Sequence, residues 1–447
     1  MEDITPDEIA PTQIHAELEN GTSEEYTLDD TSFMLPTNID RAGLSRMIND
    51  MLNLEKHVAF DILFKDEPLR TSLAEKLQEH GVKSETTIKL VYILAITEPE
   101  LTEVDNMGDW ITGIAVTNDR KHFATACYEG QVALFTSQGT EKIGDFKLEQ
   151  TSSIGIYSDP GLDKHVELVC GHMDGKMDVY FIDTRKPQLP SATATSDADD
   201  DTVKAIALDN KGQYIAAAGH SKIIYVYNNQ TIVDAFTNVK KTTSSRSKRA
   251  IETNTIEPIF SFQKHNSTVT SLKFLDISEP LLLSAAIDGQ IAIWSIKSGA
   301  ALTAFACGRA ITCIDISNTY DLVYTGHEEG TIAIWELRDK STGNVPKHTE
   351  DIPNCNLSRK SSTLMFDRLT TGIITNPKHE NIVAAVSLDG NAALIDRRYI
   401  KIPLQTVSFK NQDEPDRCTG AHWTTSQELM CTTAAGKIHK IIFKELE

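Results

Sequence analysis

The chain has 447 residues and a mass of 49.4 kDa, which is too long for one ordinary domain and suits two or three. Charged residues make up 24% of it and hydrophobic residues 40%, a composition that excludes wholesale disorder and is typical of a soluble globular protein. Acids outnumber bases by 64 to 43, and residues 1–100 hold 21 of the acids but 8 of the bases. Because phosphates attract Lys and Arg, this acidic part is unsuited to bind nucleic acid by itself. It could instead offer carboxylates to a metal or to a basic partner.

The start of the sequence and its cysteines give little indication of function. The first residues, MEDITPDE, lack the basic and apolar regions of a signal peptide, and no stretch has the roughly 18–20 consecutive apolar residues that span a bilayer. The seven cysteines are an odd number without a CxxC pair. They favour a reducing compartment and a role as small hydrophobic strand residues over a zinc site or a disulfide framework.

The N-terminal region is predicted to hold a disordered start, residues 1–11, and an α+β domain, residues 12–97. Residues 13–18 and 26–35 have the pattern of a hairpin whose turn lies at Asn20-Gly21. After Asp40, a suitable N-cap, residues 41–53 place five apolar side chains on one helical face.

The rest of this domain continues with strand, helix and strand. Residues 59–64 are apolar enough for a strand, and Ser72 with Glu75 forms a capping box for a short helix that Gly81 would end. Residues 86–96 form a final buried strand. This is the β-grasp order, so we predict a ubiquitin-like domain with a sheet packed on a helix.

A repeat runs through the remaining three quarters of the chain. Six segments place Gly directly before a short apolar strand: GQVALF, GKMDVY, GQIAIW, GTIAIW, GNAALI and GKIHKI. A seventh, SKIIYVY, fits with Ser221 in the place of the glycine. Four of the six spacings lie near the roughly 40–45 residues of a WD40 blade, and two are lengthened by insertions. Because such a unit cannot bury its faces alone, we predict an all-β, seven-bladed propeller over residues 110–447, after a linker at 98–109.

The fourth unit carries the clearest motif of the repeat. His265, Ser284, Asp288 and Trp294 have the spacing of the hydrogen-bonded tetrad of the WD40 family, which the repeats resemble. Such a chain of partners satisfies buried polar groups and holds the turn. The same residue types could be taken for a Ser–His–Asp triad, but the structural role is the better interpretation.

Two insertions are expected between the strands of the ring, at residues 229–258 and 338–363. The first contains KKTTSSRSKR and is predicted to be a mobile loop between the third and fourth blades. Its basic residues are a candidate nuclear-import signal or RNA-contacting patch, and the alternative is a solvated linker. They are Lys240, Lys241, Arg246, Lys248 and Arg249. The second insertion ends in SRKSS and is less informative.

The N-terminal domain adds a more specific resemblance. The run from LSRMINDML through KHVAFDILFKDEPLRTSLAEKLQEHGVKSETTIKLVY resembles the Notchless-like N-terminal domain. Two eukaryotic families place this domain before a WD40 propeller, namely Notchless and the WD-repeat protein 12 family that partners pescadillo. Seven blades instead of eight, the pair Asp109-Trp110 before ITGIAV, and the basic loop after the third blade favour the WD-repeat protein 12 family.

The resemblance implies a non-catalytic role in ribosome biogenesis. Members of this family join pescadillo and a second WD40 protein in a trimer on 60S precursors, and act in ribosomal RNA processing in the nucleus, nucleolus and nucleoplasm, not at a membrane. Their ubiquitin-like domain is gripped by the metal-ion-dependent adhesion site of midasin, an AAA ATPase that removes the factor from the particle. The motif GVKSETT places Glu85 where the family keeps the acidic residue that completes the coordination of the adhesion-site Mg²⁺. The protein would thus need no cofactor of its own, and the alternative for Glu85 is an ordinary solvated glutamate.

Other functions remain as alternatives. The chain contains no P-loop, GxSxG, HExxH or Rossmann glycine motif, so we do not expect an enzyme. A Notchless orthologue would share the ATPase hook and have eight blades. A ubiquitin-ligase substrate adaptor, in which the propeller binds a degron, is the alternative from another class.

Overall fold

The computed structural model divides the chain into two compact units, residues 1–97 and 98–447. It describes residues 13–447, leaving out short internal stretches and two positions at the C-terminal end. These are residues 23, 55–56, 66, 83–85, 96–97, 162–163, 188–193, 197–200, 243–253, 277–278, 318–321, 340–354, 412–413, 445 and 447. The start predicted to be disordered, residues 1–11, lies outside the described residues. Among the helices that are described, none is long and apolar enough to cross a membrane.

The described part of the first unit has two α-helices, a short 3₁₀ helix and one five-stranded sheet. Its strands are β1 (Gln13–Asn20), β2 (Ser32–Pro36), β3 (Phe60–Phe64), β4 (Glu67–Pro68) and β5 (Ile88–Leu94), and its helices are α1 (Arg41–Leu52), α2 (Leu73–Glu79) and the short 3₁₀ helix η1 (Glu24–Tyr26). The strand order is β2-β1-β5-β3-β4, in which β1 pairs antiparallel with β2 and parallel with β5. A central parallel pair flanked by antiparallel strands is the β-grasp arrangement that the order of elements predicts.

Caps set the helix ends of this unit as the sequence predicts. The Asp40 carboxylate accepts a hydrogen bond from Gly43 N at 2.7 Å, and the Ser72 hydroxyl accepts one from Glu75 N at 3.4 Å. The second strand is shorter than expected. It begins at Ser32, because Asp29 and Asp30 are exposed and continue no buried alternation.

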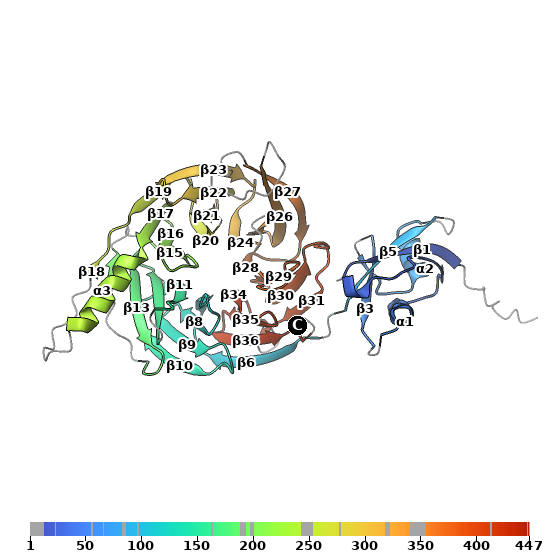
Figure 1. The fold of residues 1–447 in the computed structure, drawn as a ribbon, viewed down its shortest axis with the longest axis horizontal. Helices are drawn as coiled ribbons and strands as arrows, with labels where there is room; N and C mark the ends of the chain where they lie inside the picture. Colours follow the sequence, from blue (N-terminus) through green and yellow to red (C-terminus); the bar gives the residue numbers. More distant parts are fainter. Residues whose placement is uncertain are drawn as a thin grey trace, which may run out of the picture. The chain divides into compact units, whose positions relative to one another are not determined.

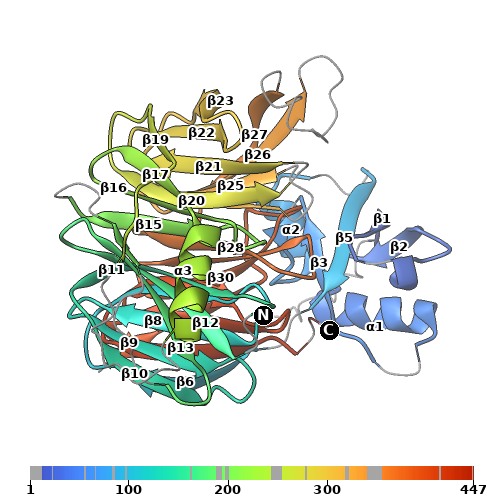
Figure 2. The same ribbon diagram turned by 60° about the vertical axis from the view of Figure 1, so that its left-hand side comes forward.

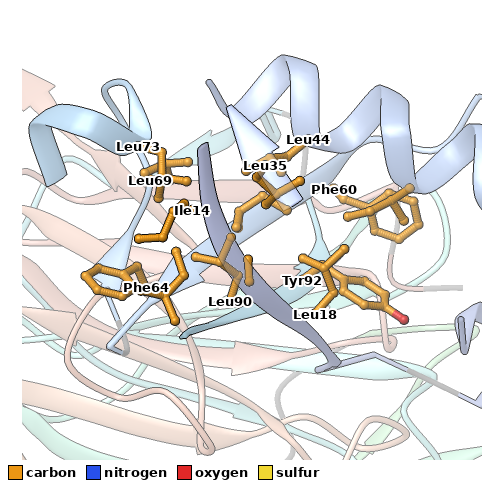
Figure 3. Packing of buried hydrophobic residues seen from close by; sticks show 14 of the residues in the cluster. Ile14, Leu18, Leu35, Leu44, Phe60, Phe64, Leu69, Leu73, Leu90 and Tyr92 are labelled. Atoms are coloured by element: carbon orange, nitrogen blue, oxygen red, sulfur yellow. The ribbon is translucent and has the colours of Figure 1, made fainter. Parts of the chain in front are cut away.

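The core of the first unit lies between the sheet and α1 (Figure 3). Alternate residues of β1 are buried, and Leu44 and Ile48 on one face of α1 are fully buried against them. Each buried side chain of this size contributes about 1.5–3 kcal/mol of transfer free energy, which is what holds a domain of this length together. The Tyr92 hydroxyl donates to the carbonyl of Tyr26 at 2.7 Å, so its burial leaves no unmet donor.

The second unit is a ring of seven sheets (Figure 1). Blade 1 contains β7 (Ile111–Val116), β8 (His122–Cys127), β9 (Gln131–Thr136) and β10 (Lys142–Lys147). Blade 2 contains β11 (Thr151–Ser158), β12 (His165–His172), β13 (Met177–Asp183), β14 (Ala194–Ser196) and β18 (Asn254–Thr255). Blade 3 contains β15 (Val203–Leu208), β16 (Tyr214–Gly219), β17 (Ile223–Asn228) and β19 (Phe260–Gln263). Blade 4 contains β20 (Val269–Asp276), β21 (Pro280–Ala286), β22 (Gln290–Ser295) and β23 (Ala300–Ala306). Blade 5 contains β24 (Ile311–Ile316), β25 (Leu322–His327), β26 (Thr331–Asp339) and β27 (Cys355–Leu364). Blade 6 contains β28 (Thr370–Thr375), β29 (Ile382–Ser387), β30 (Asn391–Asp396) and β31 (Gln405–Ser408). Blade 7 contains β34 (Cys418–Trp423), β35 (Glu428–Thr433), β36 (Lys437–Ile442) and β6 (Glu100–Asn106), and a small hairpin, β32 (Lys410–Asn411) with β33 (Glu414–Pro415), precedes it.

The inner strands make the ring continuous. Each of β7, β11, β15, β20, β24, β28 and β34 contacts the inner strand of the next blade, and β34 returns to β7. The apolar clusters lie between neighbouring blades, as where β21 and β22 of blade 4 pack on β24 of blade 5. The predicted fold class, a seven-bladed propeller preceded by a ubiquitin-like domain, is confirmed.

Hydroxyl side chains also connect successive inner strands. The second residue of an inner strand donates to the carbonyl of the first residue in the next one, as from Thr112 to Thr151, from Thr270 to Ile311 and from Thr371 to Cys418. Ser152 and Thr312 make the same contact. Each such bond contributes about 1 kcal/mol to holding neighbouring blades in register.

The prediction of a linker at residues 98–109 is wrong for most of these residues. Residues 100–106 form β6, which pairs antiparallel with β36 as the outer strand of blade 7. The other three strands of that blade come from the C-terminus. The ring therefore closes by pairing the two ends of the propeller sequence, a contact that no local pattern indicates.

The two expected insertions also differ from their prediction. Residues 229–242 form helix α3 (Asn229–Thr242) instead of a mobile loop, because Ile232, Val233 and Phe236 pack on blade 2. The Phe236 ring stacks on Phe181 with centroids 4.2 Å apart. In the second insertion, residues 355–364 are β27, the fourth strand of blade 5.

The glycine position of blade 3 is shifted by one residue from the prediction. Gly130, Gly289 and their counterparts precede the third strand with φ of 87° and 72°, in the left-handed region. In blade 3 it is Lys222, with φ 67°, that precedes β17 and adopts this conformation, not Ser221. A lysine there carries a steric cost that glycine avoids.

Candidate functional site

Glu85, the predicted ligand of a partner's metal ion, lies outside the described residues together with Lys83 and Ser84. The structure describes both ends of this segment. Before it, Gly81 has φ 62° and turns the chain after α2, and Val82 N donates to the carbonyl of Leu77 at 3.0 Å. After it, Ile88 is buried and pairs with Ala16 of β1. The segment thus connects two points that are fixed on the core of the ubiquitin-like unit.

Several of the few basic side chains in the ubiquitin-like unit form ion pairs with neighbouring acids. The Lys76 ammonium lies 2.8 Å from Glu67 and 2.9 Å from Glu79, and Arg41 lies 2.6 Å from Asp61. The hydrogen bond from Lys76 lowers the pKa of Glu67. Exposed acids such as Glu17 and Glu19 on β1 belong to the surplus that remains. The unit therefore carries a net negative charge.

The basic segment predicted to contact RNA or an import receptor is only partly described. Lys240 and Lys241 lie in the last turn of α3. Arg246, Lys248 and Arg249 lie outside the described residues. Within the described residues, this segment begins in a helix that packs on blade 2.

In blade 4 the structure brings the four residues of the expected tetrad together. The Trp294 indole Nε1 donates to Ser284 Oγ at 2.9 Å, and His265 Nε2 lies 2.8 Å from the same oxygen. His265 Nδ1 is 3.3 Å from Asp288 Oδ2, and that carboxylate also accepts from the main-chain N–H groups of Asn266 and Gln290.

The burial of this tetrad argues against catalysis. Ser284 is fully buried and its Oγ is occupied by two ring nitrogens, so no substrate can reach it. Burial lowers the pKa of His265, against the opposing effect of Asp288, and favours the neutral imidazole. The arrangement connects two strands, the loop of His265 and the turn of Asp288, and it has no exposed nucleophile.

Blade 5 holds a related arrangement that the sequence analysis missed. The Trp335 indole donates to Thr325 Oγ1 at 2.9 Å, Thr325 Oγ1 lies 2.9 Å from His327 Nε2, and His327 Nδ1 lies 3.0 Å from the carbonyl of Ala310. The signal was available, because Thr325 and Trp335 are separated as Ser284 and Trp294 are. The histidine comes from the end of the second strand instead of the preceding loop, which hid the correspondence.

A cavity of about 490 Å³ lies at the centre of the ring. Every inner strand contributes to its wall, through Ile114, Ile154, Ile206, Leu272, Asp315, Ile374 and His422. Lys273 pairs with the buried Asp315 at 2.8 Å, and Thr375 donates to the same carboxylate from both N and Oγ1 at 2.8 Å. These contacts join blades 4, 5 and 6 and leave Asp315 with a lowered pKa despite its burial, which by itself would raise it.

Metal and thiol chemistry find no support in the part of the chain that the structure describes. No group of three or more His, Cys, Asp or Glu side chains there could hold a metal ion. The seven cysteines are free, and burial raises the pKa of thiols such as Cys307 and Cys313 to about 12. A thiol with so high a pKa is a poor nucleophile.

The fold and its motifs define the class of protein: a ubiquitin-like domain joined to a WD40 propeller. The family model described as "NLE (NUC135) domain" matches residues 14–77. The model described as "WD domain, G-beta repeat" matches residues 256–295 and 301–336, which include the strands that carry the two tryptophan arrangements.

The chain is also similar, along most of its length, to curated proteins. The chain is 22% identical to "Ribosome biogenesis protein ytm1" of Schizosaccharomyces pombe, over 90% of this chain and 88% of the relative. It is 22% identical to "Ribosome biogenesis protein YTM1" of Saccharomyces cerevisiae, over 86% of each. It is 26% identical to "Ribosome biogenesis protein WDR12 homolog" of Brugia malayi, over 68% of this chain and 71% of the relative. The predicted resemblance to the WD-repeat protein 12 family is confirmed.

Proposed function

We propose that this protein is a non-catalytic ribosome-biogenesis factor of the nucleus, nucleolus and nucleoplasm, acting in maturation of the 60S subunit. The propeller joins a pescadillo-type protein and a second WD40 protein on the pre-60S particle, and the ubiquitin-like domain is bound by midasin. The observation that carries the proposal is similarity to ribosome biogenesis proteins along nearly the whole chain, through both units.

The physical character of the two units supports this division of labour. A rigid propeller offers a large fixed surface for docking other proteins. The buried tetrad has no exposed nucleophile, which is consistent with a protein that acts as a scaffold. Seven blades favour this family over Notchless, for which eight are expected.

The ubiquitin-like unit is proposed to present Glu85 to the adhesion-site Mg²⁺ of midasin. A carboxylate oxygen is a hard ligand suited to an open octahedral position on Mg²⁺. The acids in the described part of the unit give it a negative surface, which would attract a partner that carries a cation. Lys76 and Arg41 pair with neighbouring acids, so these two positive charges repel such a partner less. In this proposal the metal ion belongs to the partner.

The test is affinity purification of the tagged full chain from nuclear extract, with mass spectrometry of what is bound. We expect a pescadillo-type protein, a second WD40 protein and 60S precursors, and accumulation of large-subunit ribosomal RNA precursors when the gene is depleted. Ligase subunits in the eluate together with normal ribosomal RNA processing, and slower turnover of a client protein after depletion, would instead identify a substrate adaptor.

A further inference from the structure

The two ends of the propeller differ in charge. In each blade the loops between strands 1 and 2 and between strands 3 and 4 lie at one end of the ring, here called the first face. The remaining loops lie at the other end, called the second face, because the four strands alternate in direction. Each face is therefore built from loops of all seven blades.

Bases outnumber acids on the first face. Among the described residues of its connecting segments the bases are Arg120, Lys121, Lys164, Arg185, Lys186, Lys211, Lys297, Lys378, Arg397, Arg398, Lys401 and Lys444, and the acids are Glu98, Asp119, Glu141, Asp159, Asp209, Asp234, Glu257, Glu279 and Glu380. The second face has the opposite balance. Its described bases are Lys176, Lys222, Lys264, Arg309, Arg368, Lys410 and Arg417, and its described acids are Asp109, Glu129, Glu149, Asp174, Asp201, Asp288, Glu328, Glu329, Asp367, Asp389, Glu414 and Asp416. A positive face on a chain of net charge −21 calls for an explanation.

The positive charge of the first face is most accessible on blades 2 and 3. Lys164, Arg185, Lys186 and Lys211 are exposed, and none of them forms an ion pair with an acid in the part of the chain that the structure describes. Elsewhere on this face the bases are more often paired, as Arg398 is with Asp396 at 2.6 Å and Lys121 with Asp119 at 3.4 Å. We call these four residues the basic corner.

Main-chain contacts hold the two halves of the basic corner in place. Thr184 N donates to the carbonyl of Lys164 at 2.9 Å, which brings the loop of Arg185 and Lys186 beside Lys164. Lys211 precedes Gly212, which lies so close to blade 2 that a Cβ there would meet the Tyr157 ring at 2.3 Å. The four bases are therefore carried on two adjoining blades of one rigid ring.

Three acids near the basic corner accept hydrogen bonds from neighbouring groups. The Asp159 carboxylate accepts from Gly161 N at 2.7 Å, and Asp183 accepts from Arg185 N at 2.9 Å. Glu167 is buried against Asn229, which donates to it at 2.8 Å, and burial raises its pKa to about 8, so that it is mostly neutral at pH 7. At this corner the four bases are exposed, whereas Glu167 is buried and the Asp159 and Asp183 carboxylates are half-buried and accept main-chain hydrogen bonds.

Helix α3 extends the same region. It begins at Asn229, whose side chain also donates to the Gly212 carbonyl at 3.1 Å, and Phe236 contacts Phe181 and His165 of blade 2. Figure 2 shows α3 beside β12 and β13. Lys240 and Lys241 lie in the last turn of this helix.

We propose that the basic corner, with α3, is a docking surface for the phosphate backbone of RNA. Exposed Lys and Arg side chains spaced along a rigid rim suit a polyanion whose charges are regularly spaced. All four residues of the basic corner are Lys or Arg, whose side chains pair with phosphates. The surface would therefore contact the backbone of structured RNA and would not distinguish its base sequence. The inference rests on the proposed function only in that a pre-ribosomal particle supplies such RNA.

The experiment uses the full chain and a fluorescein-labelled RNA hairpin with a 20-base-pair stem, followed by fluorescence anisotropy. The test variant is Lys164→Gln, Arg185→Gln, Lys186→Gln and Lys211→Gln together. The matched control carries Lys147→Gln, Lys264→Gln, Arg368→Gln and Lys410→Gln, exposed positions at or near the second face, and changes the net charge equally.

We expect the test variant to weaken RNA binding at least tenfold at 0.1 M salt and to reduce the slope of log Kd against log salt by about 3, as loss of four phosphate contacts requires. The control should change Kd less than twofold. The proposal is overturned if the unaltered chain does not bind the hairpin at micromolar concentration, or if both variants weaken it equally. It is also overturned if poly-glutamate of matched charge binds as tightly as the RNA, which would assign the corner to an acidic protein.

The outcome is separable from the proposed function. Capture of pescadillo by a chain that fails to bind RNA would remove this inference and leave the proposed function. RNA binding by a chain that captures no ribosome-assembly protein would do the reverse.

Discussion

The guanidinium of Arg120 donates a hydrogen bond to the main-chain carbonyl of Trp423, with 2.7 Å between Nη1 and the oxygen. Arg120 follows the inner strand of blade 1, whereas Trp423 ends the inner strand of blade 7, so the bond crosses the seam where the ring closes. Lys142 of blade 1 also reaches Asp105 of β6 at 2.9 Å. Side chains thus reinforce the closure that β6 makes through main-chain pairing.

Replacing Arg120 by Ala should lower the free energy of unfolding by about 1.5–3 kcal/mol, the contribution of a hydrogen bond from a charged donor. The midpoint and slope of urea unfolding would measure the loss. Lys121→Ala is the matched control, because this neighbour has a side chain that is 74% exposed and should change stability by less than about 0.5 kcal/mol. Equal effects of the two substitutions would contradict a role for the Arg120 bond in closure.

Ser284→Ala should destabilise the propeller by about 2–4 kcal/mol. The substitution leaves the buried Trp294 indole N–H and the His265 Nε2 without their common partner, and each unmet buried group costs about 1–3 kcal/mol. Tryptophan fluorescence during urea unfolding reports the change. Ser298→Ala, at an exposed position of the same blade, serves as the control. If both variants unfold at the same urea concentration, the tetrad does not stabilise the blade.

The stability of the propeller should fall as the pH drops from about 6.5 toward 4. Burial, together with the charges of Lys273 and Arg120, lowers the pKa of His422 to about 4, whereas histidine in the unfolded chain titrates near 6.5. Between these values the unfolded chain binds a proton that the native state does not, so acid favours unfolding, by about 2 kcal/mol at pH 5. His422→Gln should flatten the fall in urea midpoint between pH 7 and 5, and an unchanged profile would count against this origin.

Glu167 should act in the opposite direction. Its pKa is raised to about 8 in the native state, so the proton it retains stabilises the fold fully below the unfolded value of 4.5, and this stabilisation is lost as the pH rises through about 8. Glu167→Gln keeps an acceptor for Asn229 and cannot ionise. Unfolding midpoints at pH 6 and pH 9 should therefore differ less in this variant than in the unaltered chain, and the same difference in both would refute the assignment.

Lys222→Gly should raise the free energy of unfolding by about 0.5–1 kcal/mol. Left-handed φ costs a residue with a Cβ about 1–2 kcal/mol, and part of the gain is offset by the greater freedom of glycine in the unfolded chain. Ser221→Gly is the control, since this neighbour is not among the residues with positive φ in the described chain. Thermal unfolding distinguishes them, and stabilisation by Ser221→Gly alone would restore the sequence-based alignment of blade 3.

Glu85→Ala should abolish Mg²⁺-dependent binding of the full chain to the adhesion-site domain of midasin, because no other donor of the motif is proposed to reach the ion. Binding would be followed by pull-down with Mg²⁺ and with EDTA. Glu19→Ala removes an exposed acid from β1 and should bind normally. Binding of the Glu85 variant at the level of the Glu19 variant would show that another residue makes the contact.

Local patterns were sufficient for the strands and most caps. The turn glycines and the alternating strands predicted seven blades because each hairpin is specified within about a dozen residues, where φ preference and side-chain alternation act directly. Asp40 and Ser72 cap the two helices of the first unit as expected for the same reason. Where a lysine replaces the turn glycine, as at position 222, the pattern misled by one residue.

The sequence by itself therefore determined the blade repeat, the β-grasp order and the family resemblance, all of which are written in short-range spacing. The tertiary structure alone decided that β6 closes blade 7, that α3 folds onto blade 2 through Phe236, and that Arg120 meets Trp423. These contacts join residues far apart in the chain, and their stability comes from burying surface against partners that no local window contains. The charge difference between the two faces has the same origin, since only closure of the ring gathers loops from every blade onto one side.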